Sequence, residues 1–122
     1  MIQLTNDLFD TYKDLQQHSY TLATRCTNVY EVEKIYLHQI RQIKNCITLL
    51  PYKKSLKQYF SIVIASTYTL GLVAVEQLKH IQANEKEMPD LRYLPRKALI
   101  TDMEKFSNIW LWVKLIYKYG KL

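Results

Sequence analysis

Residues 58–75 read QYFSIVIASTYTLGLVAV, eighteen consecutive positions without a charged side chain. This length barely reaches the roughly 17–25 residues that a membrane-spanning helix needs. A span would also have to hide several polar side chains from lipid: Gln58, Ser61, Ser66, Thr67, Tyr68 and Thr69. A helix that is apolar on almost every face is typical of the centre of a helical bundle. We therefore interpret the stretch as a buried central helix with no membrane around it, and keep a membrane-attached protein as the less favoured alternative.

The central helix is expected to run from about Tyr52 to about Ala83, because no proline interrupts these residues. Pro51 disfavours helical geometry at Leu50 and suits the first turn of the helix that follows it. Gly71 lies inside the helix, where glycine costs about 1 kcal/mol relative to alanine. Its position predicts either the close approach of a neighbouring helix or a mild kink.

Three more helices are expected around the central one. Apolar residues recur every three or four positions over about 6–25, 29–50 and 98–119. Residues 84–97 contain two prolines and many charges, and are predicted to form a loop. Short connections favour antiparallel neighbours. The sequence therefore predicts an all-α fold, a compact antiparallel bundle of four to five helices with a long central third helix, as a single domain over residues 1–122.

No motif in the chain indicates catalysis. His18, His38 and His80 fall on three different predicted helices, and no other residue type accompanies them in a catalytic spacing. The chain contains neither a glycine-rich phosphate loop nor a nucleophile elbow. We therefore expect a protein that is not an enzyme and has no catalytic residues.

The potential metal ligands are few. Asp7, Asp10 and Asp14 share one face of the first predicted helix and could hold a hard cation, although a solvated face at the positive helix end is the favoured interpretation. Cys26 and Cys46 lie far apart, and no further ligands accompany them. We expect no metal and no cofactor. Two unpaired thiols, with no secretory signal in the first residues, predict a cytoplasmic protein.

Charge is distributed unevenly along the chain, whose formal net charge is +6. Residues 1–33 have a net charge of −3, and residues 34–122 have a net charge of +9. Such asymmetry indicates an anionic partner such as nucleic acid, lipid headgroups or an acidic protein surface, and a solubilising surface is the alternative.

The basic residues after position 33 recur at helical spacing. They form four groups: Lys34, His38, Arg41 and Lys44 on the second helix, Lys53, Lys54 and Lys57 at the start of the third, Arg92, Arg96 and Lys97 in the loop, and Lys114 and Lys118 on the last. Rows of Lys and Arg on rigid helices can follow a phosphate backbone without reading bases, and tyrosines beside them offer rings for stacking. These twelve residues are the predicted nucleic-acid-binding residues.

The last helix is predicted to carry both core and interface residues. Its inward stripe is expected to contain Leu99, Met103, Phe106, Trp110, Val113, Ile116 and Tyr117. Trp112 points about 200° away from Trp110, so both cannot face one core. Because Trp and Tyr are enriched among interface hot spots, we predict that Trp112 and Tyr119 contact another protein.

Residues 105–121, KFSNIWLWVKLIYKYGK, form an aromatic-rich segment that ends in Lys and Gly. In this character, and in the size, helical architecture and charge of the whole chain, the protein resembles the small helical subunits of CRISPR effector complexes. The resemblance implies a structural subunit of a Cascade-like ribonucleoprotein used in antiviral defence. It implies non-sequence-specific contacts to guide RNA or displaced single-stranded DNA, and contacts with other subunits and with copies of itself.

The alternative function is a small helical protein-interaction or regulatory module that binds no nucleic acid and docks an acidic partner. The exposed aromatic residues of the last helix would be its anchors.

Overall fold

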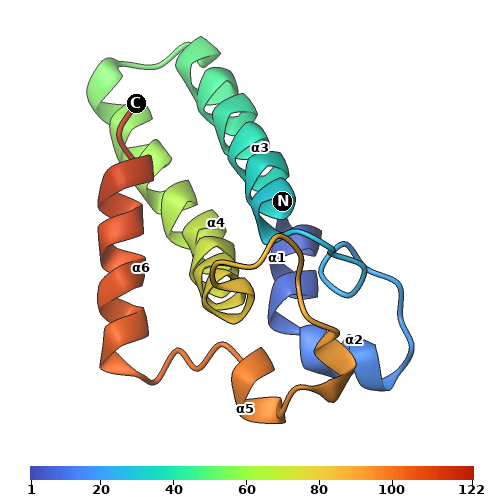
Figure 1. The fold of residues 1–122 in the computed structure, drawn as a ribbon. Coiled ribbons are helices and arrows are strands. Elements are labelled where there is room, and N and C mark those ends of the chain that lie inside the picture. Colours follow the sequence, from blue (N-terminus) through green and yellow to red (C-terminus); the bar gives the residue numbers. More distant parts are fainter.

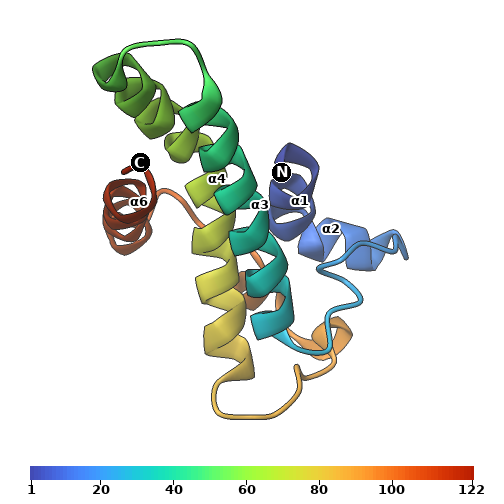
Figure 2. The same cartoon turned by 90° about the horizontal axis from the view of Figure 1, so that it is seen from above.

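The computed structural model describes residues 1–122 and contains six α-helices, one 3₁₀ turn and no strand (Figure 1). The elements are α1 (Ile2–Phe9), α2 (Thr11–Gln16), α3 (Val29–Leu49), α4 (Lys54–Gln82), η1 (Leu91–Tyr93), α5 (Arg96–Leu99) and α6 (Phe106–Tyr119). The predicted all-α bundle with a long central helix is confirmed. The central helix is α4, which packs against α3, α6, α1 and α5 (Figures 1 and 2).

α3 and α4 form an antiparallel hairpin, as predicted. The side chain of Asn28 accepts a hydrogen bond from the N–H of Tyr30 and caps the start of α3. At the same end of the hairpin, Gln82 in the last turn of α4 is buried, and its Oε1 accepts a 2.8 Å hydrogen bond from the N–H of Val29. The turn around Pro51 closes the hairpin at the opposite end.

The burial of α4 changes along its length. From Ser61 to Gln82 it contributes more buried residues than any other element, with Val73 and Val75 almost fully buried. Its first turns, by contrast, expose Leu56 and Tyr59. α4 is the one helix long and apolar enough to cross a membrane, and 50% of its most apolar window is buried inside the bundle.

The contact between α3 and α4 is built around Tyr36. Its ring is fully buried, and its hydroxyl donates a 2.7 Å hydrogen bond to the carbonyl of Tyr68 and also pairs with the hydroxyl of Thr5 on α1. A Cβ at Gly71 would collide with the phenol oxygen and the adjacent ring carbons of Tyr36. The close-approach interpretation of Gly71 is therefore the correct one.

The predicted first helix over residues 6–25 is wrong, because the chain forms two short helices and then a loop. α1 ends at Phe9, and the hydroxyl of Thr11 donates to the carbonyls of Asp7 and Leu8. After α2, His18 adopts a positive φ of 53°, and Thr24 donates to the carbonyl of Ser19. Serine and threonine hydroxyls that bond to the nearby backbone compete with helix formation, which explains the loop.

The predicted helix over residues 98–119 is interrupted. α5 ends at Leu99, and α6 begins only at Phe106. The side-chain amide of Gln77 on α4 donates to the carbonyls of Ala98 and Ile100, at 2.6 and 2.8 Å. Asn108 likewise donates to the carbonyl of Asp102. These side chains satisfy the carbonyls that a continuous helix would have used, so the break is a tertiary effect.

α6 meets α4 with a different side from the predicted one, although Ile116, which was expected inside, does pack against the core. Trp110, placed in the inward stripe, is 53% exposed, whereas the indole N–H of Trp112 donates a 2.9 Å hydrogen bond to the carbonyl of Ser66 on α4. Phe106 and Tyr117, also expected inside, are exposed. α6 is apolar on almost every face, so its periodicity could not decide which stripe packs on α4.

Candidate nucleic-acid interface

α3 presents the first predicted row as a free basic surface. Lys34, His38 and Arg41 are exposed on the side of α3 that faces away from the core, and Lys44 is half-buried at the edge of that side. None of the four forms an ion pair. The structure therefore places this row as predicted, on one rigid helix.

Glu33, which precedes Lys34 in the chain, is paired on the other side of α3, whereas Glu31 is exposed one turn before Lys34. Lys79 on α4 pairs with Glu33 on α3 and with Glu76 in its own helix. Burial opposes the charged form of Lys79, but its hydrogen bonds to the two carboxylates outweigh burial and raise the pKa of Lys79. Glu33 is thus held away from the α3 row.

The second predicted group divides in two. Lys53 and Lys54 are exposed at the start of α4, where no acidic residue occupies the first turn. The ammonium of Lys57, by contrast, donates a 2.6 Å hydrogen bond to the carbonyl of Thr48 near the end of α3. A cation at a helix C-terminus is stabilised by the helix dipole. Lys57 therefore closes the hairpin, whereas Lys53 and Lys54 form no ion pair.

α6 brings its basic end to the same end of the bundle as Lys53 and Lys54 (Figure 1). The amide of Gln58 donates to the carbonyl of Gly120 at 2.9 Å, and its oxygen accepts from the N–H of Leu122. The Tyr68 hydroxyl donates to the carbonyl of Tyr119 at 3.0 Å. Lys114 and Lys118 are both exposed along this helix.

The third predicted group does not join this surface. Arg92, Arg96 and Lys97 lie at the other end of the bundle, on η1 and α5 (Figure 1). Arg92 pairs with Asp90 at 2.6 Å, and these hydrogen bonds lower the pKa of Asp90. Arg96 lies over the ring of Tyr12, 5.7 Å from its centre. The loop group therefore lies apart from the basic residues of α3, α4 and α6.

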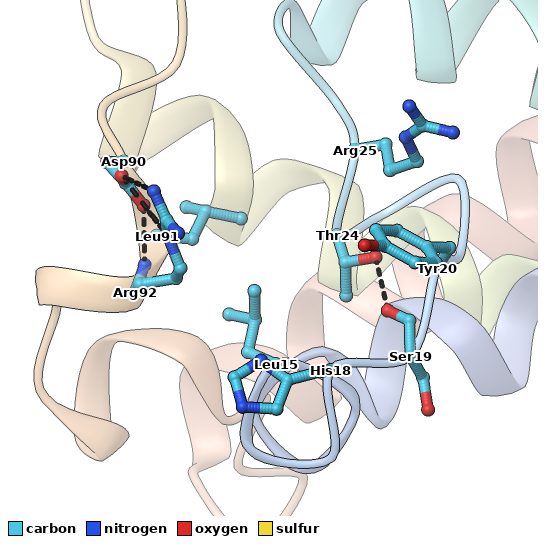
Figure 3. Close-up of a pocket in the computed structure, with 9 residues that line it drawn as sticks. All are labelled: Leu15, His18, Ser19, Tyr20, Thr24, Arg25, Asp90, Leu91 and Arg92. Carbon is cyan, nitrogen blue, oxygen red and sulfur yellow. Dashed lines mark hydrogen bonds and ion pairs between the residues drawn. The ribbon is translucent and has the colours of Figure 1, made fainter.

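Arg92 also lines an open pocket of about 310 Å³ between η1, the end of α2 and the loop that follows it (Figure 3). In Figure 3 its guanidinium is turned back onto Asp90, and Arg25 lies across the pocket. His18 is the one histidine that lines the pocket, and none of the other lining side chains is hydrogen-bonded to its imidazole. The one acid–base pair that lines the pocket is the ion pair of Asp90 and Arg92.

The acidic residues of the first helices do not form a metal site. Asp10 caps the end of α1, and Asp14 lies on α2, so the three carboxylates no longer share one helix. Burial and repulsion from Asp10 and Asp7 raise the pKa of Asp14. No group of three or more His, Cys, Asp or Glu side chains is close enough to hold a metal ion.

The predicted protein contacts, Trp112 and Tyr119, both turn toward α4 and are half-buried. The exposed aromatic side chains of α6 are instead Phe106, Trp110 and Tyr117. Their spacing of four and seven residues was visible in the sequence, but it was assigned to the core.

The packing brings together two segments of the chain that contain no acidic residue. Residues 34–75 and 105–122, which we call the acid-free segments, contain ten Lys and Arg and no Asp or Glu. The rest of the chain contains seven Lys and Arg and all eleven acidic residues. Contact between α4 and α6 joins the two acid-free segments in space. One part of the molecule is therefore wholly basic, and the other has a net negative charge.

Comparison with protein-family models, curated proteins and solved structures finds no match to this chain.

Proposed function

We propose that the protein is a non-catalytic helical subunit of a ribonucleoprotein assembly, in which it binds the backbone of single-stranded RNA or DNA without reading sequence. The observation that carries the proposal is the joining of the two acid-free segments. A surface without carboxylates repels no phosphate, and each lysine or arginine that meets a phosphate releases a counterion.

The ligand path runs along α3 and past the hairpin turn. Lys34 and Arg41 lie two turns apart, about 10 Å along the helix at 1.5 Å per residue. Lys53 and Lys54 extend the basic surface beyond the end of α3. Because the side chains stand on packed helices, their spacing is fixed before the ligand arrives, which lowers the entropy cost of binding.

Exposed apolar surface near this path supports a role within an assembly. Leu49 in the last turn of α3 is 83% exposed. An open groove of about 440 Å³ between α3 and α4 is lined by apolar side chains that include Ile43, Ile47, Phe60 and Ile64. Clustered exposed apolar side chains mark protein interfaces more often than free surface. Other subunits, or copies of this chain, would cover them.

The test is the salt dependence of binding to a fluorescent single-stranded oligonucleotide. For wild-type protein, each phosphate contact contributes about −0.7 to the slope of log affinity against log salt. Alanine at Lys34, Arg41, Lys53 and Lys54 together should reduce the slope by about 2–3 and the affinity at low salt by at least tenfold. The matched control replaces four exposed cations outside the acid-free segments by alanine: Lys13, Lys86, Arg96 and Lys97.

The control variant has the same net charge as the test variant. Equal loss of affinity in both variants, or wild-type binding that does not change with salt, would contradict the proposal. The alternative, a protein-interaction module without nucleic acid, is favoured by the α3–α4 groove. It predicts no oligonucleotide binding by wild-type protein at low salt.

A further inference from the structure

α6 presents an apolar face that no part of the chain covers. Phe106, Trp110, Val113 and Tyr117 follow one another at four, three and four residues, so they form one stripe along the helix. Their exposed fractions are 78%, 53%, 45% and 71%. We call these four residues the α6 outer face. On the opposite side of the helix, Trp112 and Tyr119 hold α6 against α4.

Lysines lie along one edge of this face. The ammonium of Lys114 is 5.5 Å from the centre of the Trp110 ring, and that of Lys121 is 4.0 Å from the centre of the Tyr117 ring. Lys118 is exposed one turn after Lys114, and its ammonium is 5.0 Å from the centre of the Tyr119 ring. From Lys105 to the last residue there is no acidic side chain, and none of these lysines forms an ion pair. Their charges are uncompensated within the molecule.

The other edge of the face continues into an apolar groove between α6 and the first half of α4. The groove has a volume of about 570 Å³ and is lined by Ile62, Val113, Ile116, Tyr117 and Leu122, with Gln58 and Lys121 as its only polar residues. The exposed apolar surface is thus wider than the stripe itself, and Lys121 is the one charged residue that lines the groove.

We propose that the α6 outer face binds an anionic phospholipid bilayer surface, with the helix axis parallel to the membrane plane. This partner goes beyond the proposed nucleic-acid ligand. Trp, Tyr and Phe rings prefer the boundary between headgroups and acyl chains, and lysines beside them can extend their ammonium groups to lipid phosphates. Ile62, Ile116 and Leu122 would add apolar surface for the acyl chains.

Two other occupants fit this face less well. A second copy docked through the same face would bring the lysines of both copies together without any acidic residue between them. Nucleic acid would gain stacking from the rings, but Val113 lies between Trp110 and Tyr117, and lysines already lie over both rings. A lipid surface offers acyl chains to the aliphatic side chains, the headgroup boundary to the rings, and phosphates to the lysines.

The test measures sedimentation with vesicles of phosphatidylcholine and phosphatidylglycerol at about 3:1, against vesicles of phosphatidylcholine alone. Wild-type protein should bind the anionic vesicles at least tenfold more tightly than the neutral ones. Trp110→Ser with Tyr117→Ser should lower the partition coefficient at least tenfold, and Lys114→Gln with Lys118→Gln several-fold. The control, Tyr20→Ser with Tyr93→Ser, removes two rings that are each 84% exposed elsewhere and should bind like wild type.

Trp110 also gives a direct signal. In a Trp112→Phe background it is the sole tryptophan, and anionic vesicles should shift its emission to shorter wavelength. Circular dichroism checks that this background is folded. Equal binding of both vesicle types, loss of binding in the Tyr20 and Tyr93 variant, or an unshifted Trp110 emission would overturn the proposal.

The same variants separate this proposal from the nucleic-acid proposal. Lys53→Ala with Lys54→Ala should weaken oligonucleotide binding and leave vesicle binding unchanged. If Trp110→Ser with Tyr117→Ser lowers oligonucleotide affinity and leaves vesicle binding intact, the face stacks bases and the lipid proposal is wrong.

Discussion

Gly71 of α4 lies under the buried ring of Tyr36 of α3. Alanine at this position would improve helix propensity by about 1 kcal/mol, but its methyl group would overlap the Tyr36 phenol. Overpacking of this kind costs about 1–3 kcal/mol. We expect Gly71→Ala to lower the free energy of unfolding by up to about 2 kcal/mol, measured by urea denaturation.

The Tyr36→Phe variant provides the control for this clash. It removes the hydroxyl oxygen, which is the atom nearest to the added methyl group. In that background Gly71→Ala should cost at least about 0.5 kcal/mol less than in wild type, a coupling typical of residues in direct contact. Equal costs in the two backgrounds would mean that the Tyr36 hydroxyl does not set the limit.

The two cysteines should differ in reactivity. Cys46 is exposed on α3, whereas Cys26 is half-buried in the loop before it. Burial is the main cause that raises the pKa of Cys26, and the nearby Glu31 adds to it against a backbone hydrogen bond from Asn28. Because the thiolate is the reactive form, Cys46 should react with a maleimide several-fold faster near pH 7.5. In Cys46→Ser the fast phase should disappear, and a fast phase that remains would place Cys26 on the surface.

The docking of α6 on α4 depends on a tyrosine that resists ionisation. Burial raises the pKa of Tyr68 from 10.0 to about 12, and its hydroxyl donates to the carbonyl of Tyr119. A tyrosine with a raised folded-state pKa keeps its proton in the folded protein after the unfolded chain has lost it. The free energy of unfolding should therefore be unaffected by Tyr68 below about pH 10 and fall as pH rises toward about 12.

Urea denaturation from about pH 8 to about pH 12 measures this effect. In Tyr68→Phe the free energy of unfolding should fall less steeply with pH. Part of the fall should remain, because the pKa values of Tyr36 and Lys79 are also raised. Tyr93→Phe, on an 84% exposed ring, should leave the slope unchanged. The same slope in the Tyr68→Phe variant and in wild type would exclude Tyr68 as a cause.

The helices that could be predicted from the sequence are those with local boundary signals. α3 has Asn28 as its cap and Pro51 just after its end, and its apolar residues define a single stripe. The basic row of α3 lies on the other side of the helix from that stripe, so its exposure could be predicted too. α6 has apolar residues on all sides, so the face that meets α4 depends on partners such as Ser66 and Tyr68, which are distant in the sequence.

The same reason explains which of the predicted basic residues lie where the sequence placed them. The exposure of Lys34 and Arg41 follows from the helical period of α3 alone. The role of Lys57 depends on the carbonyl of Thr48 across the hairpin turn. Arg96 and Lys97 lie on α5 at the far end of the bundle. The helix breaks after them, where Gln77 of α4 donates hydrogen bonds to the carbonyls of Ala98 and Ile100. Charge spacing alone contains none of this information.

At the scale of the whole molecule, α3 and α6 lie on either side of α4 (Figures 1 and 2). The α3 basic row and the α6 outer face therefore point away from each other. Adjacent helix axes are about 8–10 Å apart, so the two faces are separated by about 20 Å or more of packed protein. Salt screens charges over about 8 Å at physiological ionic strength. A ligand bound to one face should have little electrostatic effect on the other.

This separation predicts that oligonucleotide and anionic vesicles bind the protein together rather than in competition. A saturating single-stranded oligonucleotide should change the vesicle partition coefficient by less than about threefold at physiological salt, and linkage requires the reverse effect to be equally small. Fluorescent oligonucleotide should then float with anionic vesicles only when the protein is present. In the Lys34, Arg41, Lys53 and Lys54 alanine variant the protein should float without the oligonucleotide. Strong mutual exclusion in wild-type protein would mean that both ligands use one basic surface, because two anions that compete for the same lysines cannot be bound at once.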